Sequence, residues 1–337
     1  MRRIRPLLAS TALLAACTAD PEASDPEPET LGLKARKSPV TVDDVDFAYF
    51  PDVSYGAGKR RVLDLFVPEG DGPFPLLLEI HGGGFTGGDE DALYGQPGTG
   101  AFLAKVLGSG VAFANIEYRL LGEHDEGVKR SLGDVQRALQ FLRWHHAELR
   151  LDPARVVGSG ASAGAGTALW LATHDDMADP DAEDPIARQS TRLLAAAAFE
   201  TQATYDIVRW ETDVFPDYGI TIDAAAAFGA EQLLLDFYGM DALDDLYAEP
   251  VVSYRADVDM LGLMSSDDPP LLVDNQWIED QLPLDVNSLF HHPDHALVLR
   301  DEALAAGLDI DAWIPKKGIE DAAAEDFATW LAAQLAR

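Results

Sequence analysis

The chain has 337 residues, of which 58 are Asp or Glu and 25 are Lys or Arg, so its formal net charge at pH 7 is −33. A surface this acidic repels nucleic acid and anionic lipid headgroups, which makes both poor candidates for partners. Hydrophobic residues make up 47% of the chain, enough to bury the large core of one globular domain.

The N-terminal segment has the features of an export signal. Three arginines within the first five residues precede the apolar run PLLASTALLAA, which is too short for the roughly 20 residues that span a bilayer. The run ends in Leu-Ala-Ala-Cys17, which resembles the lipobox of bacterial lipoproteins, whose cysteine is lipidated. We expect residues 1–16 to be a signal peptide and Cys17 to anchor the exported protein at the outer membrane or cell surface. The alternative is a plain signal peptide that happens to contain a cysteine.

A linker follows the expected anchor. Residues 17–39 are rich in Pro, Asp, Glu and Ser and poor in aromatic residues, a composition typical of disordered segments. We therefore predict an acidic tether over 17–39 and a folded domain over 40–337. Because Cys17 is the only cysteine, no disulfide can form within the chain, and the core alone must hold the exported fold.

Strand-like and helix-like segments alternate from residue 40 onward. The helix expected at 131–149, for example, carries apolar residues at Leu132, Val135, Leu139 and Leu142, the spacing of an amphipathic helix. Strands are predicted at 60–68, 75–83, 111–120, 152–162, 193–202, 269–276 and 310–315, and helices at 99–110, 131–149, 164–176, 302–308 and 325–337. This alternation predicts an α/β fold with a mostly parallel central sheet and helices on both faces.

The segment from 205 to 268 interrupts this rhythm. It reads as a helical insertion that covers the carboxyl ends of the strands. Its aromatic residues either line a substrate pocket or simply pack the insertion onto the domain; they are Trp210, Phe215, Tyr218, Phe237 and Tyr238.

Two glycine-rich motifs carry the chemistry. The sequence Gly-Ala-Ser162-Ala-Gly stands between a predicted strand and a predicted helix, where a G-x-S-x-G pattern forms a sharp turn that exposes a nucleophilic serine. About eighty residues earlier, the HGGGF run that begins at His81 follows another predicted strand. Backbone N–H groups in such a run can point at a developing oxyanion.

These motifs, together with EYRL at 117–120 and Asp134, resemble the α/β-hydrolase fold over about residues 40–337. They are most similar to the HGGG-type carboxylesterases related to hormone-sensitive lipase and to bacterial feruloyl-esterase-like enzymes. The resemblance implies a small-molecule ester substrate with a small or medium acyl chain, no cofactor and a structural role for His81. It also implies that Ser162 is the nucleophile and that the oxyanion is held by the N–H groups of Gly83, Gly84 and Ala163.

The last quarter of the chain departs from the family pattern. The family carries its catalytic histidine after the last parallel strand, where this chain has Gly318-Ile319-Glu320, and no histidine follows His295. For the acid that orients the base, the strand at 269–276 supplies Asp274 near its end and is followed by Glu279 and Asp280. Of these, Asp280 lies closest to the expected offset.

Three explanations remain open for the missing base. A histidine from the cluster His291, His292 and His295 replaces it, in which case we expect His292 or His295 to face Ser162. Alternatively, the site works without histidine through a carboxylate or Lys316 or Lys317, or the chain is a degenerate hydrolase that serves as a binding module. An enzyme needs a base about 2.6–3.2 Å from the serine oxygen, whereas a binding module does not. The same histidines beside Asp294 have the donor types of a metal site, but one helical turn does not close such a site, so no metal is expected.

Overall fold

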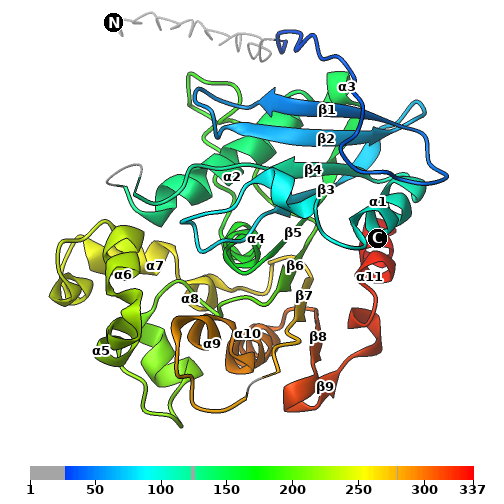
Figure 1. Cartoon of the computed structure of the whole chain (residues 1–337). Coiled ribbons are helices and arrows are strands. Elements are labelled where there is room, and N and C mark those ends of the chain that lie inside the picture. Colours follow the sequence, from blue (N-terminus) through cyan, green and yellow to red (C-terminus); the bar gives the residue numbers. More distant parts are fainter. Residues whose placement is uncertain (1–26, 123–125, 279) are drawn as a thin grey trace, which may run out of the picture.

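A computed structural model of the chain describes residues 27–122, 126–278 and 280–337 (Figure 1). The predicted signal peptide, Cys17, the first part of the predicted tether and Glu279 lie outside these residues. Within the described residues, no helix is both long enough and apolar enough to cross a bilayer.

The described chain forms one mixed sheet with the strand order β1-β2-β4-β3-β5-β6-β7-β8-β9. The strands from β4 to β8 in this order run parallel, whereas β1 and β2 at one edge and β9 at the other are antiparallel. Their bounds are β1 Phe47–Ser54, β2 Val62–Pro68, β3 Phe74–Ile80, β4 Ala112–Ile116, β5 Leu151–Ala161, β6 Ala195–Phe199, β7 Leu271–Asp274, β8 Ile310–Ile314 and β9 Ile319–Glu320. The predicted mostly parallel sheet is thus confirmed.

Helices cover both faces of the sheet (Figure 1). Apolar residues of α1 and α11 bury one face, and those of α2, α4 and α10 bury the other together with the insertion. The bounds are α1 Thr99–Gly108, α2 Val128–Trp144, α3 His146–Leu149, α4 Ala163–Thr173, α5 Ile222–Ala225, α6 Glu231–Tyr238, α7 Val251–Asp257, α8 Met260–Leu263, α9 Val286–His291, α10 Pro293–Ala306 and α11 Phe327–Leu335. This arrangement brings the loops that follow the parallel strands to one edge of the sheet, where open α/β sheets bind ligands.

The end of the predicted tether lies against the domain. Leu31 and Leu33 pack on the larger core cluster, the Leu31 N–H donates to the Glu148 carboxylate at 3.0 Å, and the Arg36 N–H donates to the Tyr49 carbonyl at 2.8 Å. The expectation that residues 17–39 are all disordered is therefore wrong for 31–36. The average composition of the segment did not reveal Leu31 and Leu33, whose removal from water lowers the free energy of the folded chain.

Candidate active site

Ser162 occupies a strained turn between β5 and α4. Its φ of 53° and ψ of −118° are unfavourable for a residue with a side chain, and the turn is held by its N–H, which donates to the Phe199 carbonyl at 2.9 Å. The flanking glycines are required because β3 passes close by. A Cβ at Gly160 would lie 2.5 Å from the Ile80 carbonyl oxygen, and one at Gly164 would lie 2.0 Å from it. Only glycine leaves room for this approach.

His291, the last residue of α9, faces the serine. Its Nε2 lies 2.9 Å from the Ser162 Oγ, and its Nδ1 lies 2.9 Å from the carbonyl oxygen of Asn287, one turn earlier in the helix. A carbonyl oxygen only accepts hydrogen bonds, so Nδ1 carries the proton and Nε2 offers a lone pair. The Ser162 hydroxyl therefore donates to Nε2, which is the tautomer that a general base needs.

The surroundings of His291 keep the imidazole neutral. Burial lowers the pKa of His291 below its ordinary value, although the hydrogen bond to the Asn287 carbonyl acts in the opposite direction. The Trp277 ring packs beside it, with the ring centroids 5.5 Å apart. A neutral imidazole at neutral pH is the form that accepts a proton.

The prediction that His292 or His295 faces Ser162 is wrong. The His292 Nδ1 accepts from the Asp294 N–H at 3.2 Å and caps α10, and its Nε2 lies 3.1 Å from the Gln281 carbonyl oxygen. His295 is fully buried, with Nδ1 accepting from the Ala203 N–H at 3.2 Å and Nε2 donating to the Leu289 carbonyl at 3.0 Å. Both rings instead bind backbone groups of neighbouring segments.

The error comes from treating His291, His292 and His295 as one cluster at the start of a single helix. The backbone of His292 is extended, so α9 ends at His291 and α10 begins at Pro293. Consecutive residues on either side of this break point in different directions. A usable signal was the sequence Asp285-Val-Asn-Ser288, which forms a capping box at the start of α9 and marks a separate helix that ends at His291.

Asp280 does not orient the base. Its carboxylate lies 3.3 Å from the Lys317 Nζ, and Lys317 also pairs with Asp294 at 2.6 Å. Among the residues that the structure describes, the His291 Nδ1 has a main-chain carbonyl as its partner and no carboxylate. The expectation for Asp280 is therefore wrong, because its loop directs it toward a lysine that follows β8. That lysine is engaged by two acids and makes no contact with Ser162, so a lysine-assisted site gains no support.

The HGGGF loop follows β3 and lies beside the serine. Gly83 and Gly84 have φ values of 109° and 59°, and a Cβ at Gly83 would lie 2.1 Å from the Gly87 carbonyl oxygen. Within the described chain, the N–H groups of these two glycines donate to no protein acceptor. Gly84 and Ala163 line the same cavity as Ser162, so N–H donors from the loop and from the start of α4 lie beside the serine.

His81 supports this loop. Its ring stacks on Tyr118 with centroids 4.2 Å apart, and the Tyr118 hydroxyl donates to the His81 carbonyl at 2.8 Å. Arg60 joins the two segments by donating to the carbonyl oxygens of Tyr118 and Gly88 at 3.1 and 2.6 Å. His81 is therefore placed to hold the loop rather than to contact Ser162.

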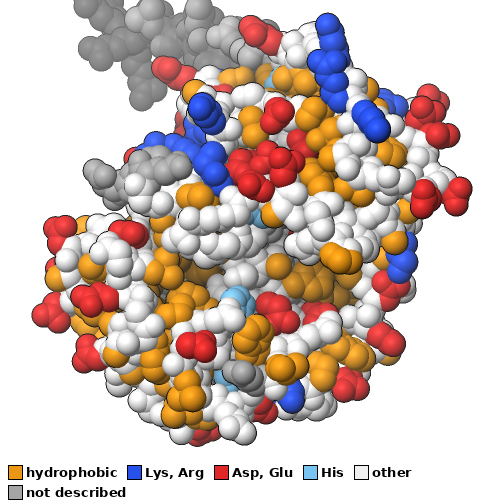
Figure 2. Space-filling model, viewed as in Figure 1, with side chains coloured by type: hydrophobic (Ala, Val, Ile, Leu, Met, Phe, Trp, Pro, Cys, Tyr) orange, Lys and Arg blue, Asp and Glu red, His pale blue; other side chains and the backbone are white. Residues whose placement is uncertain are grey.

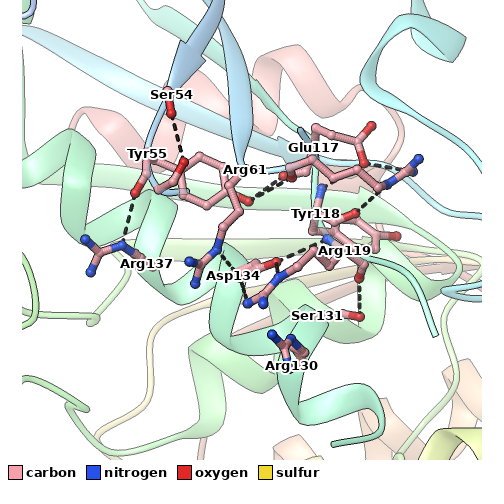
Figure 3. A network of polar contacts seen from close by, with 12 residues as sticks. Ser54, Tyr55, Arg61, Glu117, Tyr118, Arg119, Arg130, Ser131, Asp134 and Arg137 are labelled. Atoms are coloured by element: carbon pink, nitrogen blue, oxygen red, sulfur yellow. Dashed lines mark hydrogen bonds and ion pairs between the residues drawn. The ribbon is translucent and has the colours of Figure 1, made fainter. Parts of the chain in front are cut away.

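A polar network behind the loop ties α2 to the EYRL segment (Figure 3). Asp134 is fully buried and accepts hydrogen bonds from Arg61 at 2.8 Å and from the Arg119 Nε at 2.6 Å. The Ser131 hydroxyl donates to the Arg119 carbonyl at 2.6 Å. The two guanidinium groups balance the charge of the buried carboxylate. Their bonds to Asp134 hold the segment that carries Tyr118, on which the HGGGF loop rests.

Two hollows meet at Ser162. The first is narrow and apolar, with a volume of about 480 Å³ that includes its open mouth. The second, of about 1090 Å³ including its mouth, opens beside the HGGGF loop and has a mostly apolar lining that also contains the polar side chains of Glu79, His81 and Asn115. Figure 2 shows this face hollowed, with apolar side chains on either side of a histidine and acidic side chains scattered around the rim.

The insertion supplies much of the first hollow. Trp210, Phe237 and Tyr238 line it, as expected for a substrate pocket. Phe215 and Tyr218 instead pack against His292, with ring centroids 5.5 Å away in both cases. The predicted aromatic residues are thus divided between the pocket and the packing of the insertion.

Comparisons with known proteins agree with this fold. The BD-FAE family model matches residues 63–225, which include the HGGGF loop and Ser162. A truncated form of a carbohydrate esterase from gut microbiota has a similar structure, with a TM-score of 0.64 at 13% identity over 88% of this chain and 100% of that chain. The chain has the α/β-hydrolase fold.

Two curated relatives of this chain have esterase names. Gut esterase 1 from Caenorhabditis elegans is 30% identical over 125 residues, which cover 35% of this chain and 22% of that protein. The probable carboxylic ester hydrolase LipM from Mycobacterium tuberculosis is 29% identical over 175 residues, which cover 51% of this chain and 38% of that protein. The matched segments thus span less than half of the length of either relative.

The described residues of the chain hold one group with metal-ligand spacing. The carboxylate oxygens of Asp52, Asp64 and Glu90 lie within 4.8 Å of one another. The Asp64 carboxylate already accepts from the hydroxyls of Tyr49 and Tyr94 at 2.6 and 2.7 Å, so it is satisfied without an ion. The cluster of histidines that has metal-ligand residue types does not converge, because its ring nitrogens bind backbone groups and Ser162.

Proposed function

We propose that this α/β-hydrolase cleaves carboxylic esters through an acyl-enzyme on Ser162, with His291 as general base. The observation that carries the proposal is the 2.9 Å contact between the Ser162 Oγ and the His291 Nε2, which lies within the distance that proton transfer requires. A binding module has no need of this contact, and nothing in the site favours that alternative.

The reaction follows from the positions of five residues. As Ser162 attacks the carbonyl carbon, its proton passes to the His291 Nε2, and the negative charge that develops on the carbonyl oxygen is stabilised by the N–H groups of Gly83, Gly84 and Ala163. His291 then gives the proton to the leaving alkoxide, which departs as the alcohol. A water molecule, deprotonated by the same nitrogen, attacks the acyl-enzyme and releases the carboxylic acid and the free serine.

The two hollows give the ester a direction. The apolar hollow suits the acyl chain, because its walls of Trp210, Leu234, Phe237 and Phe290 offer no partner for a polar group. The wider hollow beside the HGGGF loop, which also contains polar side chains, is left for the alcohol. The limited size of the first hollow favours small acyl groups over long ones.

The test is hydrolysis of a p-nitrophenyl ester series by the purified domain. Ser162→Ala is expected to reduce activity to background, and His291→Ala to lower kcat by about 10³-fold or more. His146→Ala is the matched control, because His146 is an exposed histidine on α3, and it should keep wild-type activity. Equal activity of wild type and Ser162→Ala on every chain length would refute the proposal.

We also propose that the protein is exported and held at the cell envelope by a lipid on Cys17, which rests on the lipobox-like sequence alone. The full chain and Cys17→Ser would be expressed in a bacterium fed a labelled fatty acid. The wild type is expected to carry the label in the membrane fraction, and Cys17→Ser to carry none. Label on neither protein would count against the anchor.

A further inference from the structure

The base is carried by a very short helix whose C-terminal end is fastened by two side-chain amides. α9 has six residues, and a helix of this length is unstable by itself. The last carbonyl oxygens of a helix have no partner within it. Here the Gln202 Nε2 donates to the Phe290 carbonyl at 2.9 Å, and the Asn275 Nδ2 donates to the His291 carbonyl at 3.0 Å.

Asn275 connects this helix end to the central sheet. It follows the last residue of β7, is fully buried, and its N–H donates to the Trp313 carbonyl of β8 at 2.9 Å. Its side-chain oxygen accepts from the Trp277 N–H at 3.1 Å, while its NH₂ group serves His291. The oxygen of a side-chain amide only accepts hydrogen bonds and its NH₂ group only donates them. The two bonds therefore fix one orientation of the Asn275 side chain.

The orientation of the imidazole depends on this backbone. In the described residues, the Asn287 carbonyl accepts the hydrogen bond from the His291 Nδ1. Asn287 belongs to the same turn of α9 as His291. A carbonyl selects the tautomer and direction of the ring as a carboxylate does, but it carries no full charge to restrain the ring from a distance. The position of the ring relative to Ser162 is therefore set by how firmly the turn 287–291 is held.

We propose that Asn275 is a positioning residue for the general base, and that the Asn287 carbonyl takes the orienting role that α/β-hydrolases usually give to a carboxylate. The proposal rests on the proposed function. Asn275 touches neither the substrate nor the serine; it acts by holding the carbonyl of His291 and thereby the distance between Nε2 and the Ser162 Oγ.

The test compares Asn275→Ala and the near-isosteric Asn275→Asp with wild type in the p-nitrophenyl ester assay, well below the measured Tm of each protein. Both variants are expected to lower kcat by about 10- to 100-fold, the effect of a small displacement of a catalytic group, and to leave KM unchanged. Asn275→Asp loses the interaction because an ionised carboxylate has no proton to donate to the His291 carbonyl. A lower Tm with unchanged kcat in both variants would overturn the positioning role.

Two further sets of variants separate the parts of the inference. Glu279→Gln and Asp280→Asn are each expected to keep kcat within about threefold, because the orienting group is a carbonyl. A loss of about 10³-fold in either variant would overturn the carbonyl in favour of a carboxylate. Retained activity in Ser162→Ala and His291→Ala would instead refute the proposed function, whatever Asn275 does.

Discussion

His295, a fully buried histidine whose ring binds two backbone groups, makes the stability of the protein depend on pH. Its ring bridges the Ala203 N–H and the Leu289 carbonyl in full burial and packs on Trp210 and Phe215, with centroids 4.6 and 5.2 Å away. Burial, as the first cause, lowers the pKa of His295 from 6.5 to about 3. The folded protein therefore keeps this ring neutral at pH values where the unfolded chain binds a proton.

The stability effect follows from that difference. Between pH 6.5 and 3 the unfolded state binds more protons at this site, so the free energy of unfolding falls as the pH falls, by up to about 1.4 kcal/mol per pH unit. The full difference of 3.5 units corresponds to about 5 kcal/mol. Replacement by glutamine removes the titration and costs about 2–4 kcal/mol at pH 7.5, because the two backbone groups lose partners and a cavity forms.

Urea unfolding of wild type and His295→Gln at pH 7.5, 5.5 and 4.5 measures this effect. The stability advantage of the wild type is expected to shrink by about 2.7 kcal/mol between pH 7.5 and 4.5, since about two pH units of that range lie below the unfolded pKa. Other titrating groups, such as Glu79, are common to both proteins and cancel in the difference. An advantage that stays constant or grows on acidification would refute the reasoning.

Four further results are expected. Burial lowers the pKa of His291, so the acidic limb of kcat/KM, followed from pH 4 to 8, should have its midpoint below the ordinary histidine value of about 6.5; a midpoint above it would contradict the assignment. Burial raises the pKa of Glu79 to about 7, so wild type should lose stability relative to Glu79→Gln as the pH rises from about 4.5 to 7, which thermal unfolding at pH 5 and 8 would show; equal differences at both pH values would count against it. Gly164→Ala places a Cβ 2.0 Å from the Ile80 carbonyl oxygen and should destabilise the fold by about 3 kcal/mol or more. An unchanged Tm would mean that the turn between β5 and α4 can move away from Ile80. Phe237→Ala should enlarge the apolar hollow and shift the preferred p-nitrophenyl ester toward longer chains; an unchanged order of rates would place the acyl chain elsewhere.

Features that depend on neighbouring residues in the chain were predictable. The alternating strands and helices follow from local apolar periodicity, and the resulting parallel sheet is what such alternation requires. Ser162 was predictable because its turn needs glycines two residues before and two after it. The backbone of β3 then accounts for those glycines, since it passes within contact distance of both.

The residue that we propose as the base, His291, could not be predicted in this way, for two physical reasons. His291, His292 and His295 lie within five residues, and which one faces Ser162 depends on the break between α9 and α10, a matter of two backbone dihedral angles at His292. The orienting group is also a main-chain carbonyl, which every residue has. A search for an acidic side chain therefore had no means of finding it, and Asp280 was the wrong choice.

The amino-acid sequence by itself determined the fold class, the turn with Ser162 and the glycine-rich HGGGF loop, because local periodicity and short motifs of neighbouring residues mark each of them. Only the tertiary structure shows which histidine faces Ser162, which group its Nδ1 contacts, and how the insertion is divided between pocket and packing. Ser162 and His291 are 129 residues apart, and the ends of β6 and β7 hold α9 through Gln202 and Asn275. Such contacts depend on how the strands order themselves in the sheet, and local sequence patterns carry no record of that order.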